Sequence, residues 1–203
     1  MEKDTPQQAP MLPAEALTKC LGSLDLKTPR LRLRLTTADD QEVQIEHEMM
    51  PAIMWAIRDP QPQTEVEQRV RDLGAPWSAD EGSWISLSLE DLKTQAVIGF
   101  FFLNVISHEN QSVELGYRLH PDYWRRGYTF EAAQCLLTYC REILRVRKVV
   151  AYCISANEGS AGLLEKLGFI KEGCLRQHSA LSGQWPDELV YGLILAPQRE
   201  APQ

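Results

Sequence analysis

The N-terminal half of the chain contains segments in which apolar and polar residues alternate. Leucines alternate with arginines over residues 31–35, and Ile85, Leu87 and Leu89 alternate with polar residues over 83–89. Because strand side chains point to opposite faces in turn, both segments predict half-buried strands with their leucines toward a core. A longer apolar run over 96–106 and the segment 112–119, joined by polar residues, predict two more strands.

Helical patterns also occur in this half. Residues 13–24 can form a short amphipathic helix with Leu17 and Leu21 on one side. The run from Thr37 to Asp40 offers a helix cap before a segment that ends near residue 50. Thr64 with Glu67 has the spacing of a capping box, which predicts a helix to about residue 73.

The C-terminal half alternates helices with strands. We predict a helix over 127–145, a strand over 148–155, a helix over 158–167 and strands over 169–177 and 188–195. The result is an α/β (α+β) fold with a mixed, mostly antiparallel sheet and one parallel step across the helix 127–145. Residues 1–27 are expected to form a partly disordered arm with a short helix, 28–196 a single domain, and 197–203 a tail.

Composition excludes several classes of protein. The chain has 203 residues, 44% of them hydrophobic, and a formal net charge of -7, which argues against nucleic-acid binding and is compatible with a cationic amine substrate. The five cysteines have neither disulfide nor zinc-ligand spacing, so no metal is expected. The sequence shows neither a membrane-spanning run nor a secretion signal, and a cytoplasmic location without membrane contact is therefore expected.

The segment 123–129 leads from a strand end into a helix and can bind an anion. The first turn of a helix carries unpaired amides and a partial positive charge, and Gly127 lets the backbone approach a phosphate closely. Arg125 and Arg126 add charge. A solvated basic turn would have the same composition. The segment matches neither the dinucleotide fingerprint nor the Walker loop.

Together with other motifs, this segment resembles the GNAT superfamily of acetyl-CoA-dependent N-acetyltransferases over roughly residues 28–196. Because the segment begins with a tryptophan, it resembles the corresponding segment of the RimJ/RimL branch, which modifies the N-termini of ribosomal proteins. The motifs that carry the resemblance are Trp124-Arg125-Arg126-Gly127-Tyr128-Thr129, Glu114-Leu115-Gly116-Tyr117, the opening 28–34, Asn157 with Ser160, and Glu165-Lys166-Leu167-Gly168-Phe169. The resemblance implies six to seven strands with a splayed parallel central pair and helices on both faces. Thr129 departs from the family's preferred Gly or Ala.

The family's cofactor contacts can be carried onto this sequence. Pantetheine is expected to pair like an added strand with the backbone of Arg118, Leu119 and His120. The diphosphate is expected at the amides that follow Trp124, and Asn157 and Ser160 contact the pantetheine arm, although both can equally be read as a helix start. The diphosphate-binding residues are Arg125, Arg126, Gly127, Tyr128 and Thr129.

Acetyl transfer needs a base, a donor to the carbonyl oxygen and a proton donor to the departing thiolate. Glu114 is the candidate base, acting through water, with an exposed structural carboxylate as the alternative. A backbone amide near Leu119 would polarise the carbonyl. The tyrosine that many members place after the Asn157 helix is missing, so Ser160, or failing that Cys153, is the candidate thiolate donor. Cys153 can also be a buried structural residue.

The acceptor is the least determined part. The acidic residue that the RimL-like branch uses is absent from 176–180, where His178 is a possible substitute or a plain surface residue. Trp55, Trp77 and Trp185 can line an acceptor cleft or pack in the core.

Deprotonating an α-amino group of pKa about 8 costs on the order of 1 kcal/mol at neutral pH, against roughly 4–5 for lysine. We therefore expect transfer to the N-terminal α-amino group of a ribosomal or other protein. The alternatives are a small-molecule amine (amino sugar, polyamine or amino acid) or a non-catalytic acyl-CoA-binding regulator. The chain is expected to be a monomer or a homodimer.

Overall fold

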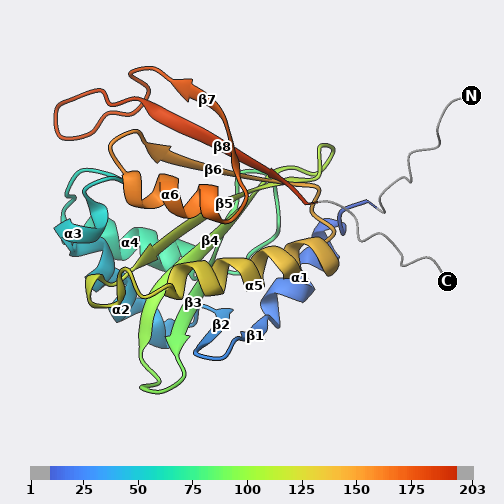
Figure 1. The fold of residues 1–203 in the computed structure, drawn as a ribbon. Helices are drawn as coiled ribbons and strands as arrows, with labels where there is room; N and C mark the ends of the chain where they lie inside the picture. The colour runs from blue at the N-terminus through green and yellow to red at the C-terminus, as the bar shows by residue number, and fades with distance from the viewer. Residues whose placement is uncertain (1–9, 196–203) are drawn as a thin grey trace, which may run out of the picture.

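The computed structural model describes residues 10–195, which form one mixed sheet with helices on both faces (Figure 1). Among these residues eight strands are hydrogen-bonded in the order β1-β2-β3-β4-β5-β6-β8-β7. Neighbouring strands are antiparallel except β5 and β6, which are parallel. The strands are β1 (Asp25–Lys27), β2 (Leu31–Leu35), β3 (Trp84–Asp91), β4 (Val97–Ser107), β5 (Ser112–Leu119), β6 (Lys148–Ile154), β7 (Ile170–Leu175) and β8 (Glu188–Ile194).

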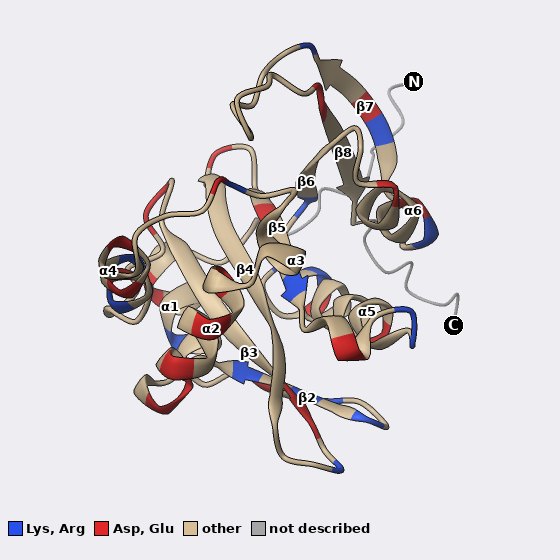
Figure 2. Cartoon of the chain, turned by 90° about the vertical axis from the view of Figure 1, so that its left-hand side faces the viewer, with Lys and Arg blue, Asp and Glu red and all other residues tan. Residues whose placement is uncertain are grey.

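The helices lie on both sides of the sheet. The helices α2 and α4 cover one face, and α5 lies on the opposite face (Figure 2). Two short 3-10 turns precede α2 and α5. The helical elements are α1 (Ala14–Gly22), η1 (Ala38–Asp40), α2 (Gln41–Met49), α3 (Pro51–Met54), α4 (Gln63–Leu73), η2 (Pro121–Tyr123), α5 (Tyr128–Glu142) and α6 (Glu158–Lys166).

The predicted elements agree with the observed ones, with three differences. The sheet exceeds the predicted six to seven strands by β1, which has only three residues and no clear alternation. The short helix α3 was not predicted. The capping box at Thr64 is wrong, because α4 begins one residue earlier, after Pro62, and Glu67 instead accepts a hydrogen bond from the Gln63 side chain at 2.8 Å.

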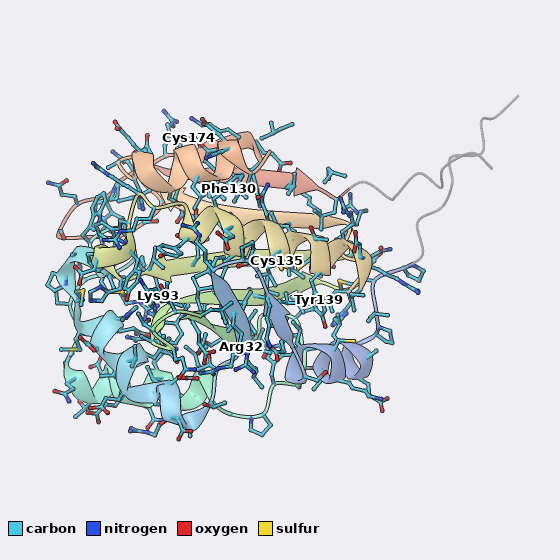
Figure 3. All side chains as sticks on the ribbon, turned by 60° about the horizontal axis from the view of Figure 1, so that its bottom comes forward. Arg32, Lys93, Phe130, Cys135, Tyr139 and Cys174 are labelled. Carbon is cyan, nitrogen blue, oxygen red and sulfur yellow. The ribbon has the colours of Figure 1, made fainter. Side chains whose placement is uncertain are left out.

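The larger core lies between the sheet and α5. Leu87 and Leu89 of β3 and Leu136 of α5 are fully buried in it. The helix α1 joins the same core through Leu17 and Leu21, and the Tyr139 hydroxyl of α5, labelled in Figure 3, donates to the Cys20 carbonyl at 3.0 Å. Residues 14–22 therefore pack on the domain. The domain boundary at residue 27 stays a prediction, and the predicted C-terminal tail and the first nine residues lie outside the described part.

The sheet opens between β5 and β6. Their register runs only from Ser112 paired with Lys148 to Glu114 paired with Val150, whereas β5 stays paired with β4 as far as Leu119. The second half of β5 therefore has one edge without a strand partner. This edge faces a gap in the middle of the sheet, and the gap positions the site.

Three further findings concern the chemistry that the chain can support. Within residues 10–195, no helix combines the length and the apolarity that crossing a membrane requires. In the same part of the chain, no three His, Cys, Asp or Glu side chains are grouped as a metal would need. All five cysteines are free, and Cys174 is exposed on β7 (Figure 3).

Candidate active site

A single cleft of about 1210 Å³ follows the gap between β5 and β6. It runs from α3 and the start of β3, past the unpaired edge of β5, to the start of α5 and the α6 helix. Most of the residues predicted from the sequence line it: Glu114, Arg118, Leu119, Trp124, Arg125, Gly127, Tyr128, Thr129, Cys153, Asn157 and Ser160. The fold thus brings together two motifs that are thirty residues apart in the sequence.

The backbone of β5 corrects part of the prediction for pantetheine. The His120 amide donates to the Ile98 carbonyl at 2.8 Å, so His120 and, two residues earlier, Arg118 direct their backbone groups toward β4. Of the three predicted residues, only Leu119 faces the gap, together with Tyr117. The prediction for Arg118 and His120 is therefore wrong as to their backbone, and His120 does not line the cleft.

The Leu119 carbonyl is already occupied. The Trp124 indole Nε1 donates to it at 2.7 Å, which ties the loop before α5 to the end of β5. The groups that remain for an added strand are the Leu119 amide and the amide and carbonyl of Tyr117. The tryptophan thus has a structural reason to stand at the start of the motif.

The start of α5 presents a row of backbone donors. Within the described chain, the amides from residue 125 to residue 130 donate to no other group, whereas the next one, of Glu131, bonds the Gly127 carbonyl. Arg125 and Gly127 have left-handed backbone conformations with φ of 59° and 78°. Alternation of this kind curves the backbone into an anion-binding concavity, and the helix dipole adds positive charge there.

A neighbouring ion pair holds this loop in shape. Arg30 donates to the Arg126 carbonyl at 3.0 Å and pairs with Glu131 at 2.6 Å. The carboxylate of Glu131, which also accepts from the Thr28 hydroxyl, is therefore neutralised although it lies in the first turn of α5. The Arg126 side chain lies over the Tyr123 ring at 5.8 Å and does not line the cleft. Of the groups of Arg126 that were predicted to bind the diphosphate, only the backbone amide therefore faces the site.

On the α6 side, three polar side chains meet at the gap. The Asn157 side chain caps α6 by accepting from the Ser160 amide at 3.1 Å, as predicted. The Ser160 hydroxyl is 2.8 Å from the Tyr117 hydroxyl, and it also bonds the Cys153 thiol. Burial raises the pKa of both Tyr117 and Cys153, so both groups stay protonated at neutral pH. Tyr117 was not predicted to have a role.

On the other face of β5, Glu114 lies half-buried beside Asn104, whose side-chain nitrogen is 3.4 Å from it. Burial raises the pKa of Glu114, and the negative charge of Glu188 raises it further. Glu188 of β8 also lines the cleft, and His178 approaches it at 3.8 Å while remaining 57% exposed. A carboxylate of the next strand therefore lines the cleft, although the motifs in the sequence did not indicate Glu188.

The tryptophans are distributed differently from the prediction. Trp55 lines the cleft and is 50% exposed, but Trp77 donates to the Ser83 carbonyl and packs against the core, and Trp185 is exposed away from the cleft. Of the two alternatives given for these tryptophans, core packing therefore holds for Trp77, whereas Trp185 neither lines the cleft nor packs in the core. Trp84 lines the cleft in their place, next to Gly116.

A splayed sheet beside an amide-lined helix start has the geometry of a class of proteins that bind an acyl-phosphopantetheine carrier. Comparison with known families agrees with this class. Residues 30–170 match the family model described as acetyltransferase (GNAT) domain, and the chain therefore belongs to the GNAT family of N-acetyltransferases, enzymes that use acetyl-CoA.

Similar proteins point in the same direction. The chain is 29% identical to an uncharacterized N-acetyltransferase, p20, of Bacillus licheniformis, over 83% of this chain and 95% of that protein. It is also 29% identical to the ribosomal protein uS5-alanine N-acetyltransferase of Escherichia coli, over 56% of this chain and 59% of that protein. The crystal structure of the ribosomal-protein acetyltransferase RimL with coenzyme A has the same fold, with a TM-score of 0.73 at 19% identity, covering 85% and 98% of the two chains.

Proposed function

We propose that this N-acetyltransferase transfers the acetyl group of acetyl-CoA to the α-amino group at a protein N-terminus. The observation that carries the proposal is the open acceptor end of the cleft. There Trp55 and Ile57, which are 50% and 49% exposed, form an apolar margin instead of a closed lid. An extended peptide needs such an opening, whereas a small amine can be enclosed. The relative that acts on ribosomal protein uS5 supports the same class of acceptor.

The amide row at the start of α5 binds the diphosphate, with Gly127 and Thr129 next to it. Lys166, whose Nζ is 4.5 Å from the Phe130 ring centre, lines the same end and adds a positive charge. The pantetheine arm then follows the free edge of β5, where the Leu119 amide and the Tyr117 backbone are its partners. This path brings the thioester to the gap.

Glu114 accepts the proton of the attacking amine through a water molecule. Its pKa lies above the ordinary value, which makes the carboxylate a better base than an exposed one at neutral pH. The amine nitrogen forms a bond to the acetyl carbon while the Leu119 amide donates to the carbonyl oxygen. Glu188 adds negative charge that favours a cationic amine on arrival.

Collapse of the intermediate breaks the carbon–sulfur bond, and the thiolate needs a proton. Ser160 supplies it and takes a proton in turn from the Tyr117 hydroxyl, 2.8 Å away, and Tyr117 regains a proton from solvent before the next turnover. Cys153 is the less suitable donor because it is a buried strand residue that already shares a hydrogen bond with Ser160. No covalent enzyme intermediate is required.

The proposal can be tested by measuring release of free CoA with acetyl-CoA and a panel of acceptors. The panel holds short peptides with free N-termini, the same peptides with blocked N-termini, free lysine, an amino sugar and spermidine. We expect turnover of the free peptides alone. Preferred turnover of spermidine or the sugar would assign a small-molecule acceptor, and binding of acetyl-CoA without turnover on any acceptor would indicate a regulator.

A further inference from the structure

The cleft continues beyond the reacting groups to a cluster of arginines on the same face of β5 as Glu114. Arg118 lies four residues further along the strand, with its guanidinium carbon 4.8 Å from the Phe102 ring centre. Between the two residues stands Gly116, and the Trp84 ring lies beside it. Arg58 and Arg69 line the cleft near Arg118. We call Arg58, Arg69 and Arg118 the arginine cluster.

One buried carboxylate neutralises only part of this cluster. Glu48 of α2, whose side chain is 3% exposed, pairs with Arg118 at 3.1 Å and with Arg69 at 2.6 Å. Arg58 forms no ion pair or hydrogen bond with any residue of the described chain. The count of three guanidinium groups and one carboxylate leaves two positive charges at this end of the cleft.

The other charged groups nearby do not balance this excess. Asp72 of α4 lines the rim, and its carboxylate accepts a hydrogen bond from the Gln68 side chain at 2.8 Å. Asp59 accepts from the Ser182 amide at 2.6 Å. His47 is buried behind Arg118, and burial lowers its pKa to about 4, so it is neutral. When the carboxylate of Asp72 is counted together with that of Glu48, the three arginines still leave one uncompensated positive charge.

One buried donor of the cluster lacks an acceptor. The Arg118 side chain is 6% exposed and lines the cleft, and its Nε has no hydrogen-bond partner within the described part of the protein. Burial of a guanidinium donor without an acceptor is unfavourable, and a missing ligand is one reason for it. Burial, and after it the positive charge of nearby Arg69, lower the pKa of Arg58. Both effects make the charged guanidinium less favourable, and a bound anion would offset them.

We propose that the arginine cluster binds a carboxylate of the acceptor, so that the preferred substrate is a protein N-terminus with an acidic side chain among its first residues. The inference rests on the proposed function and names the acceptor more closely. Four residues of strand separate Glu114 from Arg118, or about 13 Å along β5. An extended peptide advances about 3.3 to 3.6 Å per residue, so an acidic side chain at positions two to four can reach the cluster while the amine is at the gap.

The same charge distribution disfavours a polyamine. Glu114 and Glu188 attract the reacting amine at one end of the groove, but a second ammonium group would come to lie beside the uncompensated arginines. A zwitterionic acceptor satisfies both ends. The spermidine N-acetyltransferase of Vibrio cholerae has the same fold, with a TM-score of 0.72 at 20% identity, but that likeness concerns the fold alone.

The test compares two amidated pentapeptides that differ only in charge, serine-aspartate-glutamate-alanine-alanine and serine-asparagine-glutamine-alanine-alanine. Their kcat/KM and their dissociation constants with the CoA-bound protein are measured for the wild type, for Arg58→Gln and for the control Arg71→Gln. Arg71 is a matched control because it belongs to α4, is 53% exposed at its side chain and does not line the cleft.

We expect the wild type and Arg71→Gln to prefer the acidic peptide by about tenfold, as a charge-assisted hydrogen bond provides. Arg58→Gln should lose that preference, because its kcat/KM should fall more for the acidic peptide than for the amide peptide. Equal turnover and binding of the two peptides by the wild type would overturn the arginine site. So would a preference that persists in Arg58→Gln. If neither peptide is acetylated but the acidic one binds in an Arg58-dependent manner, the N-terminal function fails and the anion site stands.

Discussion

Replacement of Gly127 by asparagine and by aspartate tests the diphosphate site with two variants of equal size. The backbone at Gly127 has φ of 78°, a conformation that both residues tolerate better than other side chains. An added Cβ would meet only the Arg30 guanidinium, at 3.6 Å, so neither variant should clash with the loop. The pair then differs in one negative charge.

That charge would lie against the proposed diphosphate. Two like charges 4 Å apart repel by about 1 kcal/mol in water and by about 4 kcal/mol at the effective dielectric of a protein surface. Arg30 offsets little of this, because Glu131 already neutralises it. A net difference of about 1.4 kcal/mol makes the dissociation constant of acetyl-CoA about tenfold larger for Gly127→Asp than for Gly127→Asn.

The assay is calorimetric titration with CoA at two salt concentrations, together with thermal melting of both variants. The melting temperatures should agree, and the difference in affinity should shrink at 0.5 M salt because ions screen the repulsion. Equal dissociation constants at low salt would refute the reasoning. In that case the amides of α5 do not contact the phosphates.

Three further substitutions test the reacting groups and the buried ion pair. Glu114→Gln should lower kcat about a hundredfold in CoA release, most strongly below the pKa of the amine. Since the pKa of Glu114 is raised above 4.5, ionisation of this carboxyl destabilises the fold as pH rises through the raised value. The melting temperature of Glu114→Gln should therefore exceed that of the wild type at pH 7 and equal it below pH 4. Tyr117→Phe should lower kcat about tenfold in the same assay and leave CoA affinity unchanged. Glu48→Gln removes the counter-charge of the buried Arg118 and of the partly exposed Arg69 at a cost of about 3 kcal/mol, which should lower the melting temperature by about 10 °C, whereas exposed Glu67→Gln should not.

The strands were predictable because their patterns are local. Leucines at every second position mark β2 and β3, and burial confirms the direction of Leu31 and Leu87. The three residues of β1 carry too little pattern to detect, and their pairing with β2 is a tertiary effect. The start of α4 was misplaced because Pro62 sets the helix entry without a capping side chain.

The site was only partly predictable, since a motif specifies its own loop but not what faces it. The start of α5 follows from the sequence 123–129 alone. Glu188 and Arg58, in contrast, reach the cleft from other elements and belong to no motif. Tyr117 belongs to the strand motif of Glu114, but the motif gave it no role. Its partner Ser160, 43 residues later in the chain, was not identifiable from spacing.

The two faces of β5 separate the two halves of the proposed reaction. Glu114 and Arg118 share one face, where the amine arrives, whereas Tyr117 is on the other face with Ser160, where the thiol departs. Because strand side chains alternate, a sequence separation of three residues places the base and the proton donor on opposite faces, and a shift of one residue in register would exchange both sets. The parallel pairing with β6 ends at Glu114, so the gap opens directly after the base. The thioester must therefore lie at the free edge of β5, where both Glu114 and Tyr117 can reach it. The register of β5 thus determines the positions of both reacting groups, which explains why β5 and the start of α5 carry the most specific motifs of the sequence.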